Sequence, residues 1–179
     1  MLWPDSNTSR VIRDLWEALE RHGLPSMATH THGRHQPHVS LIVADHLPVN
    51  ASLGAVAPVP RQPIRLLIEA AGVFPGDFLF LACVADKELL DEQRRVHQAV
   101  RPLVVDPWPY FEPGTWTPHI TTGWELTSQQ LAESMPLVLD HLPIEGWLDR
   151  GGVEDGTTGE NWTSPDESAG DVKRQDPDS

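Results

Sequence analysis

Residues 37–41 read Pro37-His38-Val39-Ser40-Leu41, and residues 118–122 read Pro118-His119-Ile120-Thr121-Thr122. Each stretch has the composition of a β-strand that begins after a proline. Successive side chains of a strand point to opposite faces, so a histidine and a hydroxyl residue two positions apart share a face, while the valine or isoleucine between them enters the core. Each stretch therefore predicts a strand that presents an imidazole and a hydroxyl together.

We call His38-Val39-Ser40 motif 1 and His119-Ile120-Thr121 motif 2. If both flank one cleft, two imidazoles and two hydroxyls line it, a set that suits a phosphate group. Because the unperturbed pKa of histidine lies near ~6.5, one imidazole can accept a proton while the other donates one. The hydroxyls can donate hydrogen bonds to phosphate oxygens as negative charge builds on them. We expect His38 and His119 to be catalytic and Ser40 and Thr121 to bind phosphate, with no metal and no cofactor.

The rest of the chain alternates between helical and strand-like patterns, which predicts a mixed α+β fold. Apolar residues at helical spacing over residues 11–19 predict a first helix that ends at Gly23. Asp86 and Thr127 are predicted to cap two further helices, the last of which Pro136 should kink or shorten. Strands are predicted at residues 37–43, 64–70, 78–84, 118–122 and 144–149, with a Pro- and Ala-rich loop after the first of them, through residue 63. A hairpin-like turn at residues 74–77 is expected to join the strands at 64–70 and 78–84.

The chain has 179 residues, of which 39% are apolar, and a formal net charge of −13. This length and composition predict one domain with a hydrophobic core, over residues 1–153. Residues 154–179 are rich in Gly, Thr, Ser, Pro and Asp, which predicts an acidic, disordered tail. The sequence lacks the basic stripe of a protein that grips long nucleic acid, so we expect no long duplex nucleic acid as a partner.

The sequence shows neither a signal peptide nor an apolar run long enough to cross a bilayer. We therefore expect a cytoplasmic protein with no membrane partner. We also expect it to be a monomer. The one cysteine, Cys83, lies in an apolar run and is expected to be a core residue without a catalytic role.

The two motifs and the residues around them resemble the paired His-x-Ser/Thr motifs of the 2H phosphoesterases. This family includes bacterial RNA 2',5'-ligase-like proteins and cyclic nucleotide phosphodiesterases. The resemblance spans about residues 8–150. It implies a two-lobed, pseudo-two-fold α+β fold in which each lobe is an antiparallel sheet backed by helices, with the two motifs facing each other across a central cleft.

Two features depart from the family pattern. An apolar residue normally follows the second motif, and this chain has Thr122 there. The family also usually begins with a complete strand before its first helix, and only residues 1–3 could supply one here. Without that strand, its neighbour in the sheet would have an open edge.

The resemblance implies a metal-independent phosphoesterase that acts on 2',3'-cyclic phosphate or 2',5'-phosphodiester bonds. The substrate would be a small nucleotide or an RNA end. His119 would take a proton from the attacking water and His38 would protonate the departing ribose oxygen, although the reverse assignment stays open. The same site could run in the ligation direction. Arg34, Phe74 and Trp124 are further candidates for substrate contacts.

Two alternatives remain open. The first is a metal-binding protein, because histidines crowd around motif 1, although no cysteine or nearby carboxylate completes a recognisable ligand set. The histidines concerned are His30, His32, His35, His38 and His46. The second is a catalytically degenerate nucleotide-binding protein, whose acidic tail recruits a basic partner.

Overall fold

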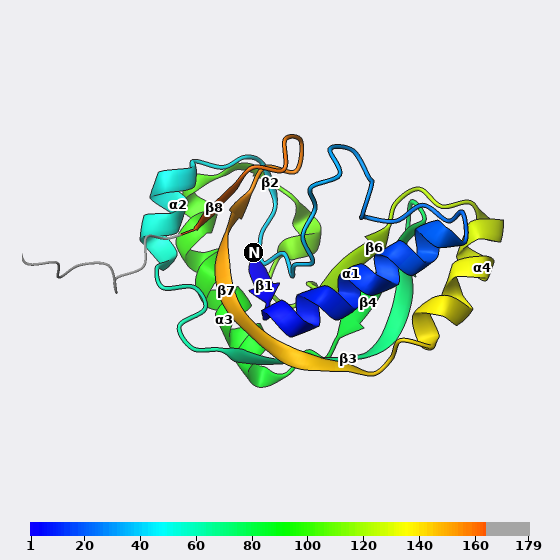
Figure 1. The fold of residues 1–179 in the computed structure, drawn as a ribbon. Helices are drawn as coiled ribbons and strands as arrows, with labels where there is room; N and C mark the ends of the chain where they lie inside the picture. Colours follow the sequence, from blue (N-terminus) through cyan, green and yellow to red (C-terminus); the bar gives the residue numbers. More distant parts are fainter. Residues whose placement is uncertain (164–179) are drawn as a thin grey trace, which may run out of the picture.

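The structure is a computed structural model, which describes residues 1–163, and it confirms the α+β class with antiparallel strand pairing (Figure 1). Within the described residues there are four α-helices and eight strands, with two short 3₁₀ turns at Arg101–Leu103 and Pro109–Phe111. In chain order the elements are β1 (Leu2–Pro4), α1 (Ser6–Arg21), β2 (Ala44–His46), α2 (Val49–Val56), β3 (Ile64–Phe74), β4 (Phe78–Cys83), α3 (Lys87–Val100), β5 (Val105–Pro107), β6 (His119–Gly123), α4 (Ser128–Leu139), β7 (Ile144–Glu154) and β8 (Asn161–Thr163).

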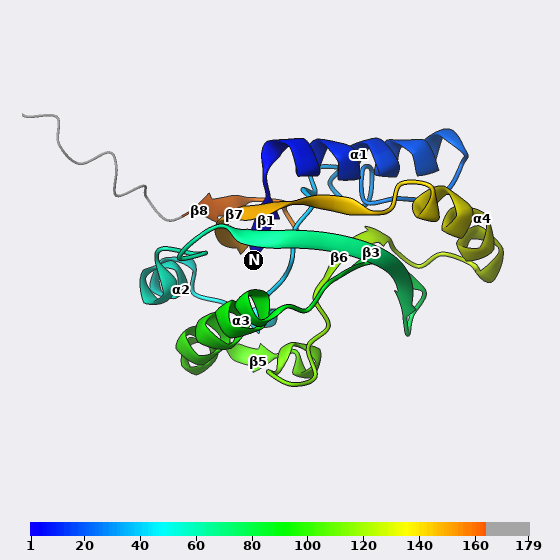
Figure 2. The ribbon, with the colours of Figure 1, turned by 90° about the horizontal axis from the view of Figure 1, so that it is seen from below.

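The main sheet has the strand order β1-β7-β3-β4-β6, and β8 pairs with β7 beside this path. Strand β3 joins the β1-β7 part of this sheet to the β4-β6 part, because residues 64–68 pair with β7 and residues 68–74 pair with β4. A separate two-stranded sheet pairs β2 with β5. In Figure 2, α1 lies on one side of the long strands β3 and β7, whereas α2 and α3 lie on the other.

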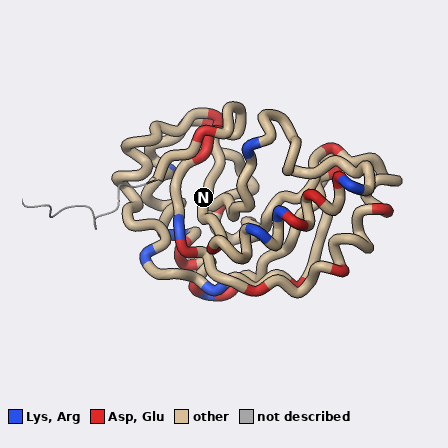
Figure 3. Tube along the Cα trace, in the orientation of Figure 1, with Lys and Arg blue, Asp and Glu red and all other residues tan. Residues whose placement is uncertain are grey.

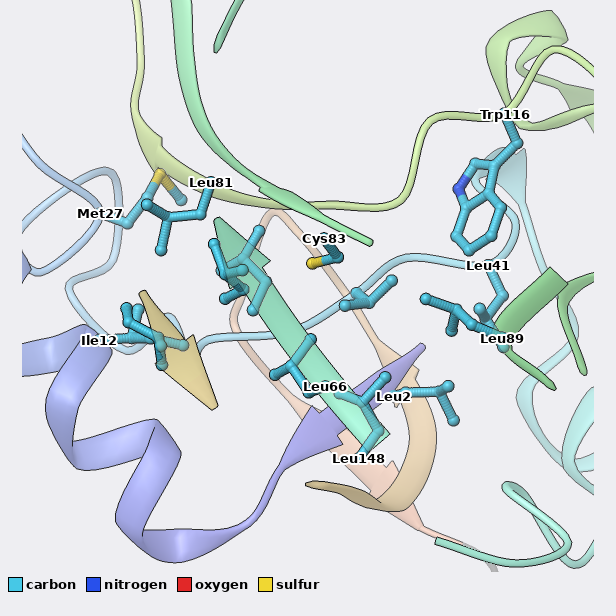
Figure 4. Packing of buried hydrophobic residues seen from close by; sticks show 14 of the residues in the cluster. Leu2, Ile12, Met27, Leu41, Leu66, Leu81, Cys83, Leu89, Trp116 and Leu148 are labelled. Atoms are coloured by element: carbon cyan, nitrogen blue, oxygen red, sulfur yellow. The ribbon is translucent and has the colours of Figure 1, made fainter. Parts of the chain in front are cut away.

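The core lies between these helices and the sheet, and Figure 4 shows part of it. Leu2, Leu66 and Leu148 come from three different strands and are each at most 1% exposed. Fully burying one such leucine contributes roughly 1.5–3 kcal/mol. Cys83 belongs to the same cluster, and burial raises the pKa of its thiol to about 12. Cys83 is therefore a core residue, as expected.

Local sequence signals predicted several elements correctly. The side chain of Asp86 caps α3 by accepting a hydrogen bond from the backbone N–H of Leu89, and Thr127 with Gln130 forms a capping box on α4. The hairpin of β3 and β4 turns where it was expected, around residues 74–77. Pro136 lies inside α4, which continues to Leu139, so the proline does not shorten the helix.

The prediction of a regular strand over residues 37–43 is wrong. Only Val39 forms a bridge, with Leu2, and the next strand begins at Ala44. The backbone carbonyls between these points accept hydrogen bonds from the Trp116 indole, the Gln93 amide and the Trp108 backbone. The segment is extended, but donors from distant parts of the chain replace a sheet partner.

Two other segments are more ordered than predicted. Helix α2 lies in the expected Pro- and Ala-rich loop, where it buries Ser52, Leu53 and Val56. Strand β7 continues to Glu154 instead of ending near residue 149, and β8 pairs with it. This hairpin occupies the first ten residues of the predicted disordered tail, whose remainder, residues 164–179, lies outside the described residues.

The short strand at the start of the chain does form. β1 pairs with β7, placing Leu2 opposite Gly151, and the bridge to Val39 lies on its other side. The edge of β1 is therefore covered where motif 1 passes it. Over residues 1–163, none of the helices combines the length and the apolar character that a membrane span requires.

Candidate active site

Motif 2 lies on β6, as predicted. This strand pairs with β4, and His119 stands opposite Ala82 while Thr121 stands opposite Phe80. Ile120 between them is 1% exposed. Strand alternation therefore places the imidazole and the hydroxyl on the face opposite the buried isoleucine.

Motif 1 achieves the same alternation without a regular strand. Val39 and Leu41 are fully buried, whereas His38 and Ser40 are only partly buried. The bridge between Val39 and Leu2 consists of two backbone hydrogen bonds, of 2.8 and 2.9 Å. This bridge anchors the extended segment and leaves the imidazole and the hydroxyl on the side away from the core.

Two buried polar side chains connect the segments that carry the motifs. The indole Nε1 of Trp116 donates to the carbonyl of Ser40 at 3.0 Å. The Nε2 of Gln93 on α3 donates to the carbonyl of Leu41 at 3.2 Å and to that of Phe111 at 2.8 Å. The chain leading into motif 2 is thereby fixed against motif 1.

The two motif histidines have the same hydrogen bond. The Nδ1 of His38 lies 2.8 Å from the carbonyl oxygen of Gln36, and the Nδ1 of His119 lies 2.7 Å from that of Thr117. A carbonyl oxygen can only accept, so Nδ1 carries a proton in both rings. Among the described residues neither Nε2 has a hydrogen-bond partner.

Burial lowers the pKa of both histidines below the ordinary value. At His38 this effect is opposed by the negative charge of Glu154 and by the hydrogen bond to Gln36. At His119 it is opposed by the hydrogen bond to Thr117, and positive charge on His38 lowers the pKa of His119 further. His38 is thus close enough for its charge to affect the protonation of His119.

Aromatic rings surround His119. The ring of Phe74 lies edge-on to it with centroids 4.8 Å apart, and Phe80 and Phe111 follow at 5.6 and 6.4 Å. Of the predicted substrate contacts, Phe74 is therefore beside a motif histidine. Trp124 instead packs edge-on against Phe78 at 4.3 Å.

The predicted contact Arg34 belongs to a histidine-rich loop and is exposed. Its guanidinium donates to the carbonyl of Thr158, in the turn between β7 and β8. In the same loop, the ring of His30 stacks on Trp124 at 5.3 Å. The loop thus spans from the β7–β8 turn to the end of β6, and Arg34 is engaged with that turn and not with a motif residue.

The histidines of this loop lie close together. The ring centroid of His35 is 4.1 Å from that of His32 and 5.7 Å from that of His30. Over the described residues, no three His, Cys, Asp or Glu side chains are arranged so that they could hold a metal ion.

Sequence reasoning missed Glu154, which lies within the predicted tail. Its side chain is 3% exposed, and its carboxylate oxygens lie 3.5 Å from His35 Nδ1 and 4.0 Å from His38 Nδ1. No local signal marked this residue, because its burial depends on the pairing of β7 with β8. A pocket of about 160 Å³, lined mostly by aliphatic side chains, is bordered by Glu154 and by Ser40 of motif 1.

The chain matches the model of a known protein family. The model of the 2'-5' RNA ligase superfamily matches residues 4–153, which include both motifs. This superfamily belongs to the 2H phosphoesterases, so the resemblance of the chain to this family is confirmed. The match supports a phosphoesterase-type activity in general and a small RNA or nucleotide as substrate. No curated protein matches the chain.

Proposed function

Because the chain belongs to the 2'-5' RNA ligase superfamily, we propose that it is a metal-independent phosphoesterase with two catalytic histidines. Its substrates are 2',3'-cyclic phosphates or 2',5'-phosphodiester bonds of nucleotides or RNA ends. The observation that carries this proposal is that His38 and His119 form the same hydrogen bond. In each ring Nδ1 donates to a backbone carbonyl, and Nε2 has no protein partner among the described residues.

In the proposed reaction, the Nε2 of one histidine takes a proton from water as the water oxygen attacks phosphorus. The Nε2 of the other gives its proton to the ribose oxygen as the bond from that oxygen to phosphorus breaks. Burial favours neutral imidazoles in the free protein. The negative phosphate compensates, because a nearby opposite charge favours the protonated form of the donor.

The hydroxyls of Ser40 and Thr121 are proposed to donate hydrogen bonds to the non-bridging phosphate oxygens. Each stands two residues after its histidine, so the imidazole and hydroxyl of a motif share one side of the backbone. Negative charge grows on these oxygens in the five-coordinate transition state, where a fixed donor is most effective. Imidazoles and hydroxyls together supply both the proton transfers and the charge stabilisation that the reaction needs.

We further propose that the two motifs face one cleft between two lobes, with Phe74 beside the nucleoside. Three links support this placement: Trp116 to Ser40, Gln93 to both flanking segments, and the charge interaction of His38 with His119. Arg34 and Trp124 remain proposed contacts at the rim, and a nucleobase stacked on an aromatic ring is a common arrangement.

The charge distribution favours a small substrate. Lys and Arg are outnumbered by Asp and Glu, 13 to 26. In the described part of the chain, Lys and Arg are interspersed with Asp and Glu, as along α1 (Figure 3). Long nucleic acid is usually held by many phosphate contacts from basic side chains. A terminal or cyclic phosphate, which needs few contacts, is therefore the proposed ligand.

The test is turnover of 2',3'-cyclic AMP in EDTA by the wild-type protein and by His38→Ala and His119→Ala, with folding checked by circular dichroism. Each variant should lose at least about 100-fold in turnover, since each lacks one proton-transfer group. His141→Ala is the matched control, because the Nδ1 of His141 is also bonded to a carbonyl, 2.8 Å away, but lies after α4. This control should retain wild-type turnover.

If the wild-type protein binds the nucleotide without turning it over, and 2',5'-linked substrates are also not cleaved, the catalytic proposal is wrong. The nucleotide-binding alternative then applies. Turnover that requires added zinc would contradict the metal-independent mechanism.

A further inference from the structure

A buried carboxylate lies beside motif 1, whereas within residues 1–163 no carboxylate is paired with motif 2. Glu154 Oε2 lies 4.0 Å from His38 Nδ1, and Glu154 Oε1 lies 3.5 Å from His35 Nδ1. Within the described residues, neither Glu154 Oε2 nor His35 Nδ1 has a hydrogen-bond partner. A carboxylate this buried is costly unless neighbouring positive charge stabilises it, and imidazoles are the groups that its oxygens face.

The β7–β8 hairpin fixes the position of Glu154. Glu154 pairs with Asn161 across the two strands, and the carboxylate of Asp155 accepts the backbone N–H groups of Thr157 and Thr158 in the turn. Gly152 permits close packing here, because a Cβ at this position would lie 2.2 Å from the carbonyl oxygen of Trp162. The carboxylate is therefore held by a paired strand and a hydrogen-bonded turn, not by a free loop.

The surroundings of His119 are different. Its ring neighbours are aromatic, with Phe74 and Phe80 closest, and among the described residues it forms no pair with a carboxylate. The two histidines have the same tautomer and the same kind of backbone hydrogen bond. They differ in the charge beside them.

We propose that Glu154 is a positioning residue whose carboxylate stabilises protonated His38, which makes His38 the proton donor and His119 the proton acceptor. The inference rests on the proposed function and decides between its two open assignments. His38 gives its Nε2 proton to the departing ribose oxygen, and the Nε2 of His119 receives the proton of the attacking water. The two imidazoles end with exchanged protonation at Nε2, and each Nδ1 keeps its own proton, which it donates to its carbonyl partner.

Several charged groups face this cluster. The carboxylate faces His38 from motif 1, His35 from the histidine-rich loop and the α-amino group of Met1, which donates to the carbonyl of Gly152. Behind His35 lies the ring of His32. Burial lowers the pKa of His38, and the negative charge of Glu154 and the hydrogen bond to Gln36 raise it. Positive charge on the Met1 α-amino group and on His35 lowers it further. Removing the charge of Glu154 should therefore lower the pKa of His38, whereas removing the charge of His35 should raise it.

The experiment is an NMR titration of the imidazole signals in the full-length free protein, with the His38 signal assigned by its absence from His38→Ala. In Glu154→Gln the pKa of His38 should fall by roughly one to three units, as expected for the loss of an opposite charge at this distance. In His35→Gln it should rise. The pKa of His119 should change less than that of His38 in both variants.

Glu112→Gln is the matched control, because the carboxylate of Glu112 lies 3.4 Å from His97 Nε2, outside both motifs. It should leave the His38 titration as in the wild type. If Glu154→Gln does not fold, His35→Gln still tests the coupling. The inference would be overturned if the pKa of His38 were unchanged in Glu154→Gln, or if it fell in His35→Gln.

Activity separates this inference from the proposed function. If His38 is the donor, Glu154→Gln should reduce turnover of 2',3'-cyclic AMP at neutral pH by about tenfold or more, because a one-unit fall in pKa reduces the protonated fraction about tenfold. Full turnover in a variant whose His38 pKa has fallen would overturn the donor assignment. A wild-type protein without turnover, but with the predicted NMR shifts, would contradict the proposed function and leave the charge coupling intact.

Discussion

The indole of Trp116 donates its Nε1 proton to the carbonyl oxygen of Ser40 across 3.0 Å. Trp116 is 7% exposed and stands three residues before His119, while Ser40 belongs to motif 1. This single hydrogen bond therefore connects the segment that leads into motif 2 with the hydroxyl-bearing residue of motif 1. Together with the hydrogen bonds of Gln93, it holds the two motifs in their relative placement.

We expect Trp116→Phe to reduce turnover of a 2',3'-cyclic phosphate by about 10- to 100-fold, because small misplacements of catalytic groups have effects of this size. The unfolding free energy should fall by about 1–3 kcal/mol, since a buried carbonyl loses its donor. Enzyme kinetics and urea denaturation measure the two effects.

Trp16→Phe provides the comparison. Trp16 on α1 is 2% exposed, and its Nε1 has no hydrogen-bond partner within the described residues. This substitution removes a similar volume but no hydrogen bond, so stability should fall while turnover stays at the wild-type value. Equal losses of turnover in the two variants would show that the Trp116 hydrogen bond has no special role.

Thr121→Val should lower turnover by about 10²- to 10³-fold, because it removes a hydroxyl that we propose donates to the phosphate in the transition state. Substrate binding should change less than turnover, which steady-state kinetics will show as a fall mainly in kcat. The neighbouring residue makes a matched control. Thr122 is fully buried, and its Oγ1 has no partner in the described part of the chain.

Thr122→Val should keep wild-type turnover and raise the unfolding free energy by about 1 kcal/mol, since an unsatisfied buried hydroxyl is unfavourable. Thr122 is as buried as the apolar residues of the core. A Thr121→Val variant as active as Thr122→Val would argue against phosphate binding by Thr121.

Stability should depend on pH through the buried histidines. Burial lowers the pKa of His119 in the folded protein, so the unfolded chain binds the proton more readily. The unfolding free energy should therefore fall as pH decreases below about 6.5, the ordinary pKa of histidine. His119→Gln should show a smaller fall, because glutamine does not titrate. Urea denaturation at about pH 7.5 and about pH 5 will measure this difference, and identical pH dependence in both proteins would contradict it.

Local patterns predicted those parts of the fold that depend on neighbouring residues. The caps at Asp86 and Thr127, the β3–β4 hairpin and the alternation of motif 2 follow from short stretches of sequence. The motif histidines and hydroxyls were also identified in this way. Their catalytic and binding roles remain predictions, which the experiments above test.

The features that sequence reasoning missed depend on distant contacts. Residues 40–43 looked like a strand because their pattern is strand-like, but their carbonyls accept donors such as Trp116 and Gln93 from far along the chain. Glu154 looked like part of a polar tail because its composition is polar. Its burial beside His35 and His38 results from the pairing of β7 with β8, which no local sequence pattern predicts.

The most direct test of the two-histidine mechanism is the pH dependence of kcat/KM for 2',3'-cyclic AMP in EDTA. The wild-type profile should be bell-shaped, because one histidine must be neutral and the other protonated. His38→Ala and His119→Ala should each retain only weak activity and should each lose a different limb of the bell. A bell-shaped profile that persists with both limbs in either variant would contradict the mechanism.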